Sequence, residues 1–178
     1  CGVVAADPAL LETLSIDKLL PATDDVPERF EFGTLPYELM AGTTAAIDFL
    51  ASLSGDRDET KHRRELILEG FAALHAHEEA LRPRMEAGIR ALPGVRVFSN
   101  AEKRTPTLLF TLDGHDDQDV RRALAERQIN APAGSFYALE CSRHLGLGDT
   151  GAIRVGLAPY TNDEDVDRLL TALREVAG

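Results

Sequence analysis

The sequence is poor in cysteine and in long apolar runs, and each shortage excludes a class of protein. Only two of its 178 residues are cysteines, Cys1 and Cys141. Two cysteines do not make the disulfide framework of a small secreted domain, so the cytoplasm is the default compartment. No apolar run approaches the roughly 20 residues that span a bilayer, and we therefore expect no membrane segment.

Basic residues are also scarce. Lysine and arginine number 19 against 30 aspartates and glutamates, which gives a formal net charge of −11 with the acids spread along the chain. Because nucleic-acid phosphates need a basic surface, this balance argues against a nucleic-acid partner. Gly146, Gly148 and Gly151 do not form a strand–turn–helix phosphate loop, so a dinucleotide-binding fingerprint is absent as well.

The chain begins with an apolar segment, CGVVAA, which is typical of an interior strand. We predict a strand over residues 2–6, although neither an initiator methionine nor a signal peptide precedes it. A buried strand needs neighbours on both sides. We therefore expect the chain to be a piece of a longer protein, cut at its front.

Hydrophobic periodicity predicts the remaining elements. The first half should contain a short helix from Pro8 to about Leu14, a long ordered loop over 15–36, a helix over 36–53, a break at Ser54–Asp56, and a helix over 60–92 that Pro83 kinks or divides near Leu81. The second half should contain strands at 95–98 and 106–112, a helix at 116–127, an edge-like strand at 129–133, a loop or short helical segment at 135–149, a last strand and a last helix. This order predicts an α/β chain with a small α+β domain, whose helices lie on one face of its sheet.

Arg154 is the most informative residue, because it stands alone between Ile153 and Val155 in the last strand. An arginine in an apolar strand is expensive to desolvate unless an anion meets it. Its planar guanidinium suits bidentate binding of a carboxylate. Two interpretations remain open: Arg154 binds a ligand's carboxylate, or it forms an ion pair with one of the chain's own acids.

The segment after Arg154 reads as a tight turn and a capped amphipathic helix. Thr161 and Glu164 have the spacing of a capping box, in which each side chain satisfies a backbone N–H at the helix start. One helical face should carry Val166, Leu169, Leu170, Leu173 and Val176.

Three weaker candidates each have an ordinary explanation. Gly33–Thr34 lies just before a helix and forms either an anion cradle or a simple turn with a helix cap. Cys141 precedes Arg143 and His144, and nearby cations favour the reactive thiolate, although an inert loop thiol is the commoner case. His75 and Glu79 could share a metal ion at helical spacing, whereas His75 and His77 point apart; a solvated helix face is the preferred interpretation, and we predict no metal site.

Five stretches in order resemble the class V aminotransferases, a family of pyridoxal-phosphate enzymes that includes cysteine desulfurases and selenocysteine lyases. The stretches are Val26–Thr34 (VPERFEFGT), the small-residue helix around Ala41–Leu50, Arg104–Thr107 (RTPT), Gly134–Ala138 (GSFYA), and Ile153–Leu157 (IRVGL) with Tyr160–Asn162 (YTN). They span nearly the whole chain, and the closest resemblance is to the cysteine-desulfurase-like branch.

The resemblance implies a fold and roles for individual residues. The chain would be the C-terminal portion of a fold-type-I pyridoxal-phosphate transferase, with residues 1–54 finishing the large cofactor-binding domain and 55–178 forming the bridging helix and small domain. Arg154 would bind the α-carboxylate of an amino-acid substrate. Gly33 and Thr34 would reach the pyridoxal 5'-phosphate of the partner subunit, in a homodimer with shared active sites.

The chain also departs from the family pattern. The lysine that forms a Schiff base with the cofactor would lie upstream of Cys1, since none of Lys18, Lys61 and Lys103 has its context, so we expect the fragment alone to be inactive. Where sulfur-mobilising desulfurases carry a reactive cysteine, this chain has Tyr137, and Cys141 lies four residues later as a low-probability nucleophile. Desulfurase, lyase, transaminase and epimerase reactions all remain open, and the alternative function is a non-catalytic acidic domain that binds a partner protein.

Overall fold

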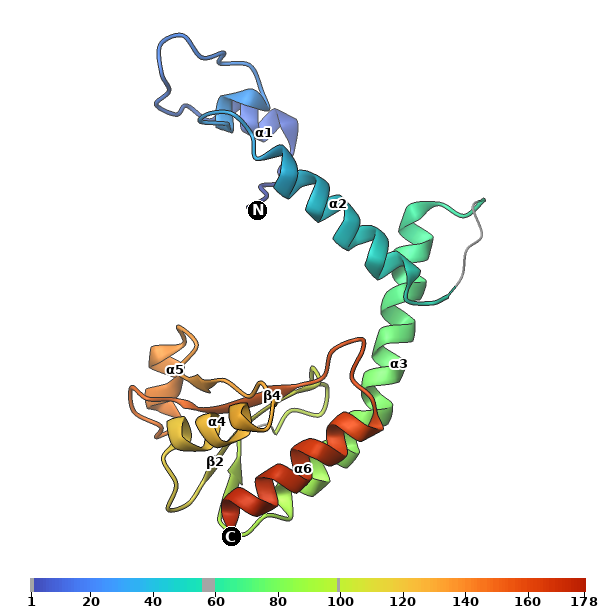
Figure 1. Ribbon diagram of the computed structural model, residues 1–178. Helices are drawn as coiled ribbons and strands as arrows, with labels where there is room; N and C mark the ends of the chain where they lie inside the picture. The colour runs from blue at the N-terminus through green and yellow to red at the C-terminus, as the bar shows by residue number, and fades with distance from the viewer. Residues whose placement is uncertain (1, 56–59, 99) are drawn as a thin grey trace.

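The computed structural model describes residues 2–55, 60–98 and 100–178, and its elements follow the predicted order. The first half contains α1 (Pro8–Thr13), a 3-10 turn η1 (Glu28–Phe30), α2 (Tyr37–Ser52) and α3 (Arg63–Arg90). The second half contains β1 (Val95–Val97), β2 (Thr107–Leu112), α4 (Asp117–Glu126), β3 (Ala133–Gly134), α5 (Leu139–His144), β4 (Ala152–Gly156) and α6 (Asp163–Ala177). Figure 1 shows the sheet beside the second half of α3, whereas α2 crosses the first half of α3 and leads away from it to α1 and the N-terminal loop.

The sheet has four strands in the order β1-β2-β4-β3, and all neighbours are antiparallel. Residues alternate between its two faces, so Leu108, Phe110 and Leu112 of β2 point into the core. Helices α3, α4 and α6 supply the other side of that core, which is one continuous apolar cluster. The predicted sheet with helices on one face is therefore confirmed.

The last helix packs as its pattern predicts. Val166, Leu169, Leu170 and Leu173 of α6 are all buried, which confirms the predicted apolar face. At the other end of the molecule, α2 approaches α3 so closely that a Cβ added at Gly70 would overlap the carbonyl oxygen of Leu50. This helix pair leaves large apolar residues exposed, namely Tyr37, Leu39, Met40, Ile47, Phe49, Leu68 and Phe71.

The prediction of a strand over residues 2–6 was wrong. These residues belong to no helix or strand, and Val3 and Val4 are 78% and 82% exposed. A strand forms only by hydrogen bonding to a neighbour, and within the described part of the chain no strand lies beside this segment. The first residue of that apolar segment, Cys1, lies outside the described residues.

We had predicted that Pro83 would kink the long helix or divide it near Leu81. The structure shows that it does not divide the helix. Helix α3 runs for 28 residues with Pro83 inside it. Proline removes one backbone hydrogen bond, but Leu81 and Met85 on either side are buried in the core. Their packing favours a continuous helix. The predicted break before this helix reaches Asp56, which lies outside the described residues, and the domain boundary at 54/55 stays a prediction.

Two boundaries differ from the prediction for local reasons. The edge strand begins at Ala133 rather than 129, because the backbone N–H of Ile129 still donates to Leu124 at the end of α4. The capping box of α6 forms between Asn162 and Asp165, one residue later than predicted. Thr161 instead accepts a hydrogen bond from the N–H of Ala158 at 2.9 Å and closes the turn before the helix.

Candidate functional site

Arg154 lies on the sheet face opposite the helices. Its strand neighbours Ile153 and Val155 point into the core, so the alternation of β4 directs the arginine the other way. Its direct partner across the sheet is Leu109 of β2, which is only partly buried. Arg154 itself is exposed. The sequence therefore predicted a buried strand correctly, but the arginine belongs to the strand's open side.

The guanidinium of Arg154 contacts an aromatic ring rather than an acid. Its Cζ atom lies 3.9 Å from the centroid of the Phe136 ring. Among the residues that the structure describes, no carboxylate forms an ion pair with it. The alternative in which Arg154 forms an ion pair with an acid of the same chain therefore has no support among these residues. The planar N–H donors of Arg154 remain available to an external anion.

Phe136 belongs to a turn with an unusual backbone. Phe136 and Tyr137 have φ angles of 53° and 63°, in the left-handed region that residues other than glycine rarely adopt. The N–H of Ala138 donates to the carbonyl of Ser135 at 2.8 Å and closes this turn. Sequence reasoning included Phe136 in a family-like stretch but gave it no role, because periodicity carries no signal for such a conformation.

Gly151 supports the same turn from β4's side. Its φ is 78°, and a Cβ added there would overlap the carbonyl group of Gly134 and the amide of Ser135. In α5, the buried hydroxyl of Ser142 donates to the carbonyl of Gly148 at 2.7 Å and ties this helix to the loop that leads to Gly151. The turn is therefore held against Gly151, just before β4, by close backbone contact.

Tyr137 and Cys141 lie beyond this turn. Tyr137 occupies the position at which the resemblance places a reactive thiol, and its side chain is fully exposed at 106%. Cys141 is exposed too, and it belongs to α5, so the helical alternative for residues 135–149 holds at this position. A helical position fixes its backbone, so Cys141 cannot take the place of residue 137 without unwinding α5.

Arg104, the first residue of the family-like RTPT stretch, ties the start of β2 to the long helix. Its guanidinium donates to both carboxylate oxygens of Glu86, at 3.0 Å in one of the two contacts. Arg90 and Arg82 donate to the same carboxylate at 2.8 and 3.3 Å. The hydrogen bonds from Arg104 and then Arg90 hold the pKa of Glu86 below its ordinary value despite its burial. This cluster is structural and fixes β2 on α3.

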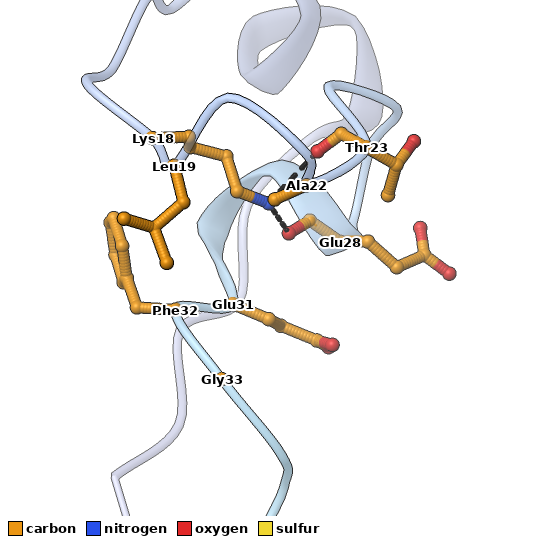
Figure 2. Close-up of a pocket in the computed structure, with 8 residues that line it drawn as sticks. All are labelled: Lys18, Leu19, Ala22, Thr23, Glu28, Glu31, Phe32 and Gly33. Carbon is orange, nitrogen blue, oxygen red and sulfur yellow. Dashed lines mark hydrogen bonds between the residues drawn. The ribbon is translucent and has the colours of Figure 1, made fainter.

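The second candidate site, Gly33–Thr34, follows a loop that two basic side chains organise. Lys18 Nζ donates to the carbonyls of Thr23 and Glu28 at 2.9 and 2.5 Å, as Figure 2 shows. Arg29 donates to the carbonyls of Leu11, Glu12, Leu14 and Asp24. These contacts order the loop without a hydrophobic core, and sequence reasoning missed both residues.

The donors of Gly33 and Thr34 are open to an anion. Both residues are exposed, and within the described residues neither backbone N–H nor the Thr34 hydroxyl has a hydrogen-bond partner. No side chain caps the following helix, α2, whose N-terminus begins at Tyr37. Backbone amides, a hydroxyl and an uncapped helix start are the groups that bind phosphates in proteins. The arrangement therefore fits a phosphate group.

One chain does not bring the two candidate sites together. In Figure 1 the loop before α2 lies at one end of the α2–α3 pair, whereas β4 and its Arg154 belong to the sheet at the other end. Gly33 lines a pocket of about 260 Å³ with Lys18, Phe32 and other loop residues, and no residue of the sheet lines it. A site that used both would need a second chain or a further domain.

The other candidate residues have local partners. His77 Nε2 lies 2.8 Å from the carbonyl oxygen of Thr161 and links α3 to the turn before α6. Lys61 pairs with Glu69 at 2.7 Å, and Lys103 is exposed. Within the described ranges, no three His, Cys, Asp or Glu side chains are grouped so that they could hold a metal ion, and none of the helices could span a bilayer.

Comparison with known proteins identifies the family. The family model for aminotransferase class-V matches residues 9–169 of this chain, so the chain belongs to that family. A probable cysteine desulfurase of Pseudomonas putida is 33% identical over 147 residues, which cover 83% of this chain and 32% of the relative. Another, from Mycolicibacterium paratuberculosis, is 30% identical over 85% of this chain and 19% of its own length. The chain thus spans a third or less of these two relatives.

Solved structures confirm the fold. The cysteine desulfurase CsdA of Escherichia coli matches with a TM-score of 0.74 and 25% identity, over 96% of this chain and 40% of that one. A cysteine desulfurase of Thermococcus onnurineus matches with a TM-score of 0.70 and 23% identity, over 91% of this chain and 37% of that one. The fold class predicted from the sequence, that of the fold-type-I pyridoxal-phosphate enzymes, is therefore confirmed.

Proposed function

We propose that this chain supplies the substrate-carboxylate site and the cofactor-phosphate loop of a pyridoxal-phosphate enzyme that acts on an amino acid. The observation that carries the proposal is Arg154, an exposed guanidinium on the open sheet face with no acidic partner among the described residues. Family membership gives the proposal its chemical class.

Arg154 would bind the α-carboxylate of the substrate through two parallel N–H···O hydrogen bonds. Such a fork fixes the direction as well as the position of the carboxylate. Because the carboxylate is attached to Cα, its orientation determines which bond at Cα is presented for cleavage. Orientation of this kind can supply several kcal/mol of a reaction barrier.

Gly33 and Thr34 would hold the cofactor through its phosphate. When bound, pyridoxal phosphate supplies an electron sink for the bonds at the substrate's Cα. The two backbone amides and the hydroxyl match the acceptors of a phosphate, and each charge-assisted hydrogen bond is worth about 1.5–3 kcal/mol. We propose that the lysine that binds the cofactor lies in another part of the protein, so the chain alone does not catalyse.

The test of the carboxylate site is Arg154→Lys in the complete enzyme. Lysine keeps the charge but loses the fork, so kcat/KM for the amino-acid substrate should fall about tenfold or more, or about 1.4 kcal/mol. Arg96→Lys is the matched control, because Arg96 lies exposed on β1 and also stacks on an aromatic ring, Phe98. Steady-state kinetics with a panel of L-amino acids that includes L-cysteine gives both results.

Unchanged kinetics in Arg154→Lys would refute the assignment. If the complete protein also failed to bind pyridoxal phosphate, the alternative of a non-catalytic acidic interaction domain would stand in its place.

We further propose that the reaction does not pass sulfur through a cysteine of this chain. Tyr137 holds the position of the thiol, and Cys141 is fixed in α5. Cys141→Ala in the complete enzyme should therefore leave the rate of substrate turnover within about twofold of the parent, as for an exposed residue without a role in the reaction. Mass spectrometry after incubation with L-cysteine provides the second measurement. A persulfide on Cys141 in the parent enzyme would show that Cys141 is a sulfur-carrying nucleophile and would contradict this proposal.

A further inference from the structure

We propose that Phe136 is a positioning residue that holds the guanidinium of Arg154 flat on the open sheet face, ready for a carboxylate. The inference rests on the proposed function of Arg154 and deepens it. The juxtaposition that carries it is the strained Gly134–Ala138 turn, which places an aromatic ring 3.9 Å from the guanidinium carbon.

The type of contact matters, because an aromatic ring and an acid restrain an arginine differently. A carboxylate partner would occupy the in-plane N–H donors of Arg154, which are the groups that a substrate needs. A ring stacked on the guanidinium face leaves all of those donors free and still restricts the plane. Phe136 can therefore restrain Arg154 without competing with its ligand.

The backbone of the turn supports a functional origin. Phe136 and Tyr137 are consecutive residues with φ angles of 53° and 63°, an unfavourable combination for side chains of this size. Strain of this kind persists where the surrounding structure imposes it, and it gathers at binding sites. Here it turns the chain back after β3 and brings the Phe136 ring over β4's open side.

The contact between Arg96 and Phe98 shows what an ordinary pair looks like on the same sheet. These residues are two apart along β1 and its extension, so the regular pleat places both side chains on one face. The Arg96 guanidinium lies 4.6 Å from the ring centroid, and Phe98 is not among the residues with positive φ. No strained turn is needed there. The pair at Arg154 is the one that the fold builds with special geometry.

The first measurement is the reactivity of Arg154 toward phenylglyoxal, an arginine-specific reagent, in the complete enzyme loaded with cofactor. Digestion and mass spectrometry report modification at Arg154 and Arg96 separately. Phe136→Leu removes the ring and should speed modification of Arg154 by about threefold, as expected for loss of an exposed cation–π contact. Phe98→Leu, the matched control, should speed modification at Arg96 alone.

The second measurement is steady-state kinetics with the amino-acid substrate. Phe136→Leu should raise KM about two- to tenfold, because a freely rotating guanidinium binds the carboxylate less well, and kcat should change less than KM. Phe136→Tyr keeps the ring and should restore both KM and the modification rate. Phe136→Asn removes the ring with a residue that tolerates left-handed backbone, and it should behave like Phe136→Leu even if leucine disturbs the turn.

The outcomes separate the two proposals. Unchanged modification of Arg154 in both Phe136→Leu and Phe136→Asn would overturn the positioning role, even if Arg154→Lys still abolished substrate affinity. Faster modification of Arg154 in the Phe136 variants, together with an unchanged KM, would instead overturn the carboxylate role of Arg154. In that case Arg154→Lys should also leave kcat/KM unchanged.

Discussion

Glu86 shows how a single residue can hold two parts of this chain together. Its side chain is nearly buried, at 9% exposure for the residue, and it accepts hydrogen bonds from Arg82, Arg90 and Arg104. Arg104 comes from the segment before β2, whereas the others belong to α3. Removing the carboxylate charge would leave three guanidinium groups facing each other.

The first prediction at this scale concerns Glu86→Gln in the complete protein. We expect urea unfolding to show a loss of about 3 kcal/mol, the lower end for removing one member of a buried ion pair. Glu79→Gln is the matched control, because Glu79 is more exposed and, among the described residues, forms its ion pair with Arg82 only. It should cost much less. Equal effects of the two changes would contradict a central role for Glu86.

The same residue predicts a pH dependence. Its hydrogen bonds to Arg104 and Arg90 lower the folded-state pKa of Glu86 from the ordinary value of 4.5. A carboxyl with a lowered folded-state pKa stabilises the fold at neutral pH and loses that contribution as pH falls below about 4.5 and through the lowered pKa. Urea unfolding at stepped pH should therefore show a shallower acid loss in Glu86→Gln than in the parent.

Individual residues also show what could and what could not be predicted from the sequence. Arg154 could be singled out from the sequence, because it is a charge between two apolar strand residues, but its role as a ligand for a carboxylate stays a prediction. Phe136 could not, since its role depends on a φ angle that its residue type disfavours. The contacts of Lys18 and Arg29 with backbone carbonyls could not be predicted either, because such acceptors have no signature in the sequence.

Among the elements, the contact between the residue before β4 and the turn after β3 leaves no room for an added side chain. Gly151 combines a φ of 78° with direct contact to the backbone of Gly134 and Ser135. Gly148 has a similar φ of 60° but open space around it. The two glycines therefore allow backbone strain to be separated from close approach.

We predict that Gly151→Ala is much more damaging than Gly148→Ala. The left-handed backbone alone costs an alanine about 1–2 kcal/mol, and this should be the whole effect at position 148. At position 151 the added methyl group must also displace the Gly134 turn. Urea unfolding should show the larger loss there, and phenylglyoxal should modify Arg154 faster. Similar losses of unfolding free energy at both positions would show that the Gly134–Ala138 turn can shift at little energetic cost.

Element boundaries show which signals are local. Helices α2, α3, α4 and α6 were predicted within a few residues, because caps and apolar periodicity belong to the segment itself. The strand expected over 2–6 was not, since a strand depends on a neighbour from elsewhere. The short strand β3 begins later than predicted, because the N–H of Ile129 donates to Leu124 at the end of α4.

For the whole molecule, the separation of Gly33–Thr34 from Arg154 bears on assembly. We propose that the complete protein is a homodimer in which the Gly33–Thr34 loop of one subunit binds the cofactor phosphate of the other. The exposed apolar residues of α2 and α3 are of the kind that protein interfaces bury.

Mixed dimers test this proposal. One variant lacks the cofactor-binding lysine, and the other carries Gly33→Ala with Thr34→Val; each should be inactive alone. If the loop acts in trans, each mixed dimer has one site free of both defects, and an equal mixture should regain about a quarter of the parent activity. If the loop acts in cis, every site carries a defect and no activity returns.

The apolar surface that α2 and α3 leave exposed has a further consequence for the stability of the protein in a cell. Tyr37, Leu39, Phe49 and Phe71 are each at least half exposed in this chain. Chaperones and quality-control proteases recognise such surfaces as signs of incomplete folding. A copy that synthesis or cleavage left with this surface uncovered would be bound or degraded rather than accumulate. The abundance of the protein would then report on how completely this surface is covered.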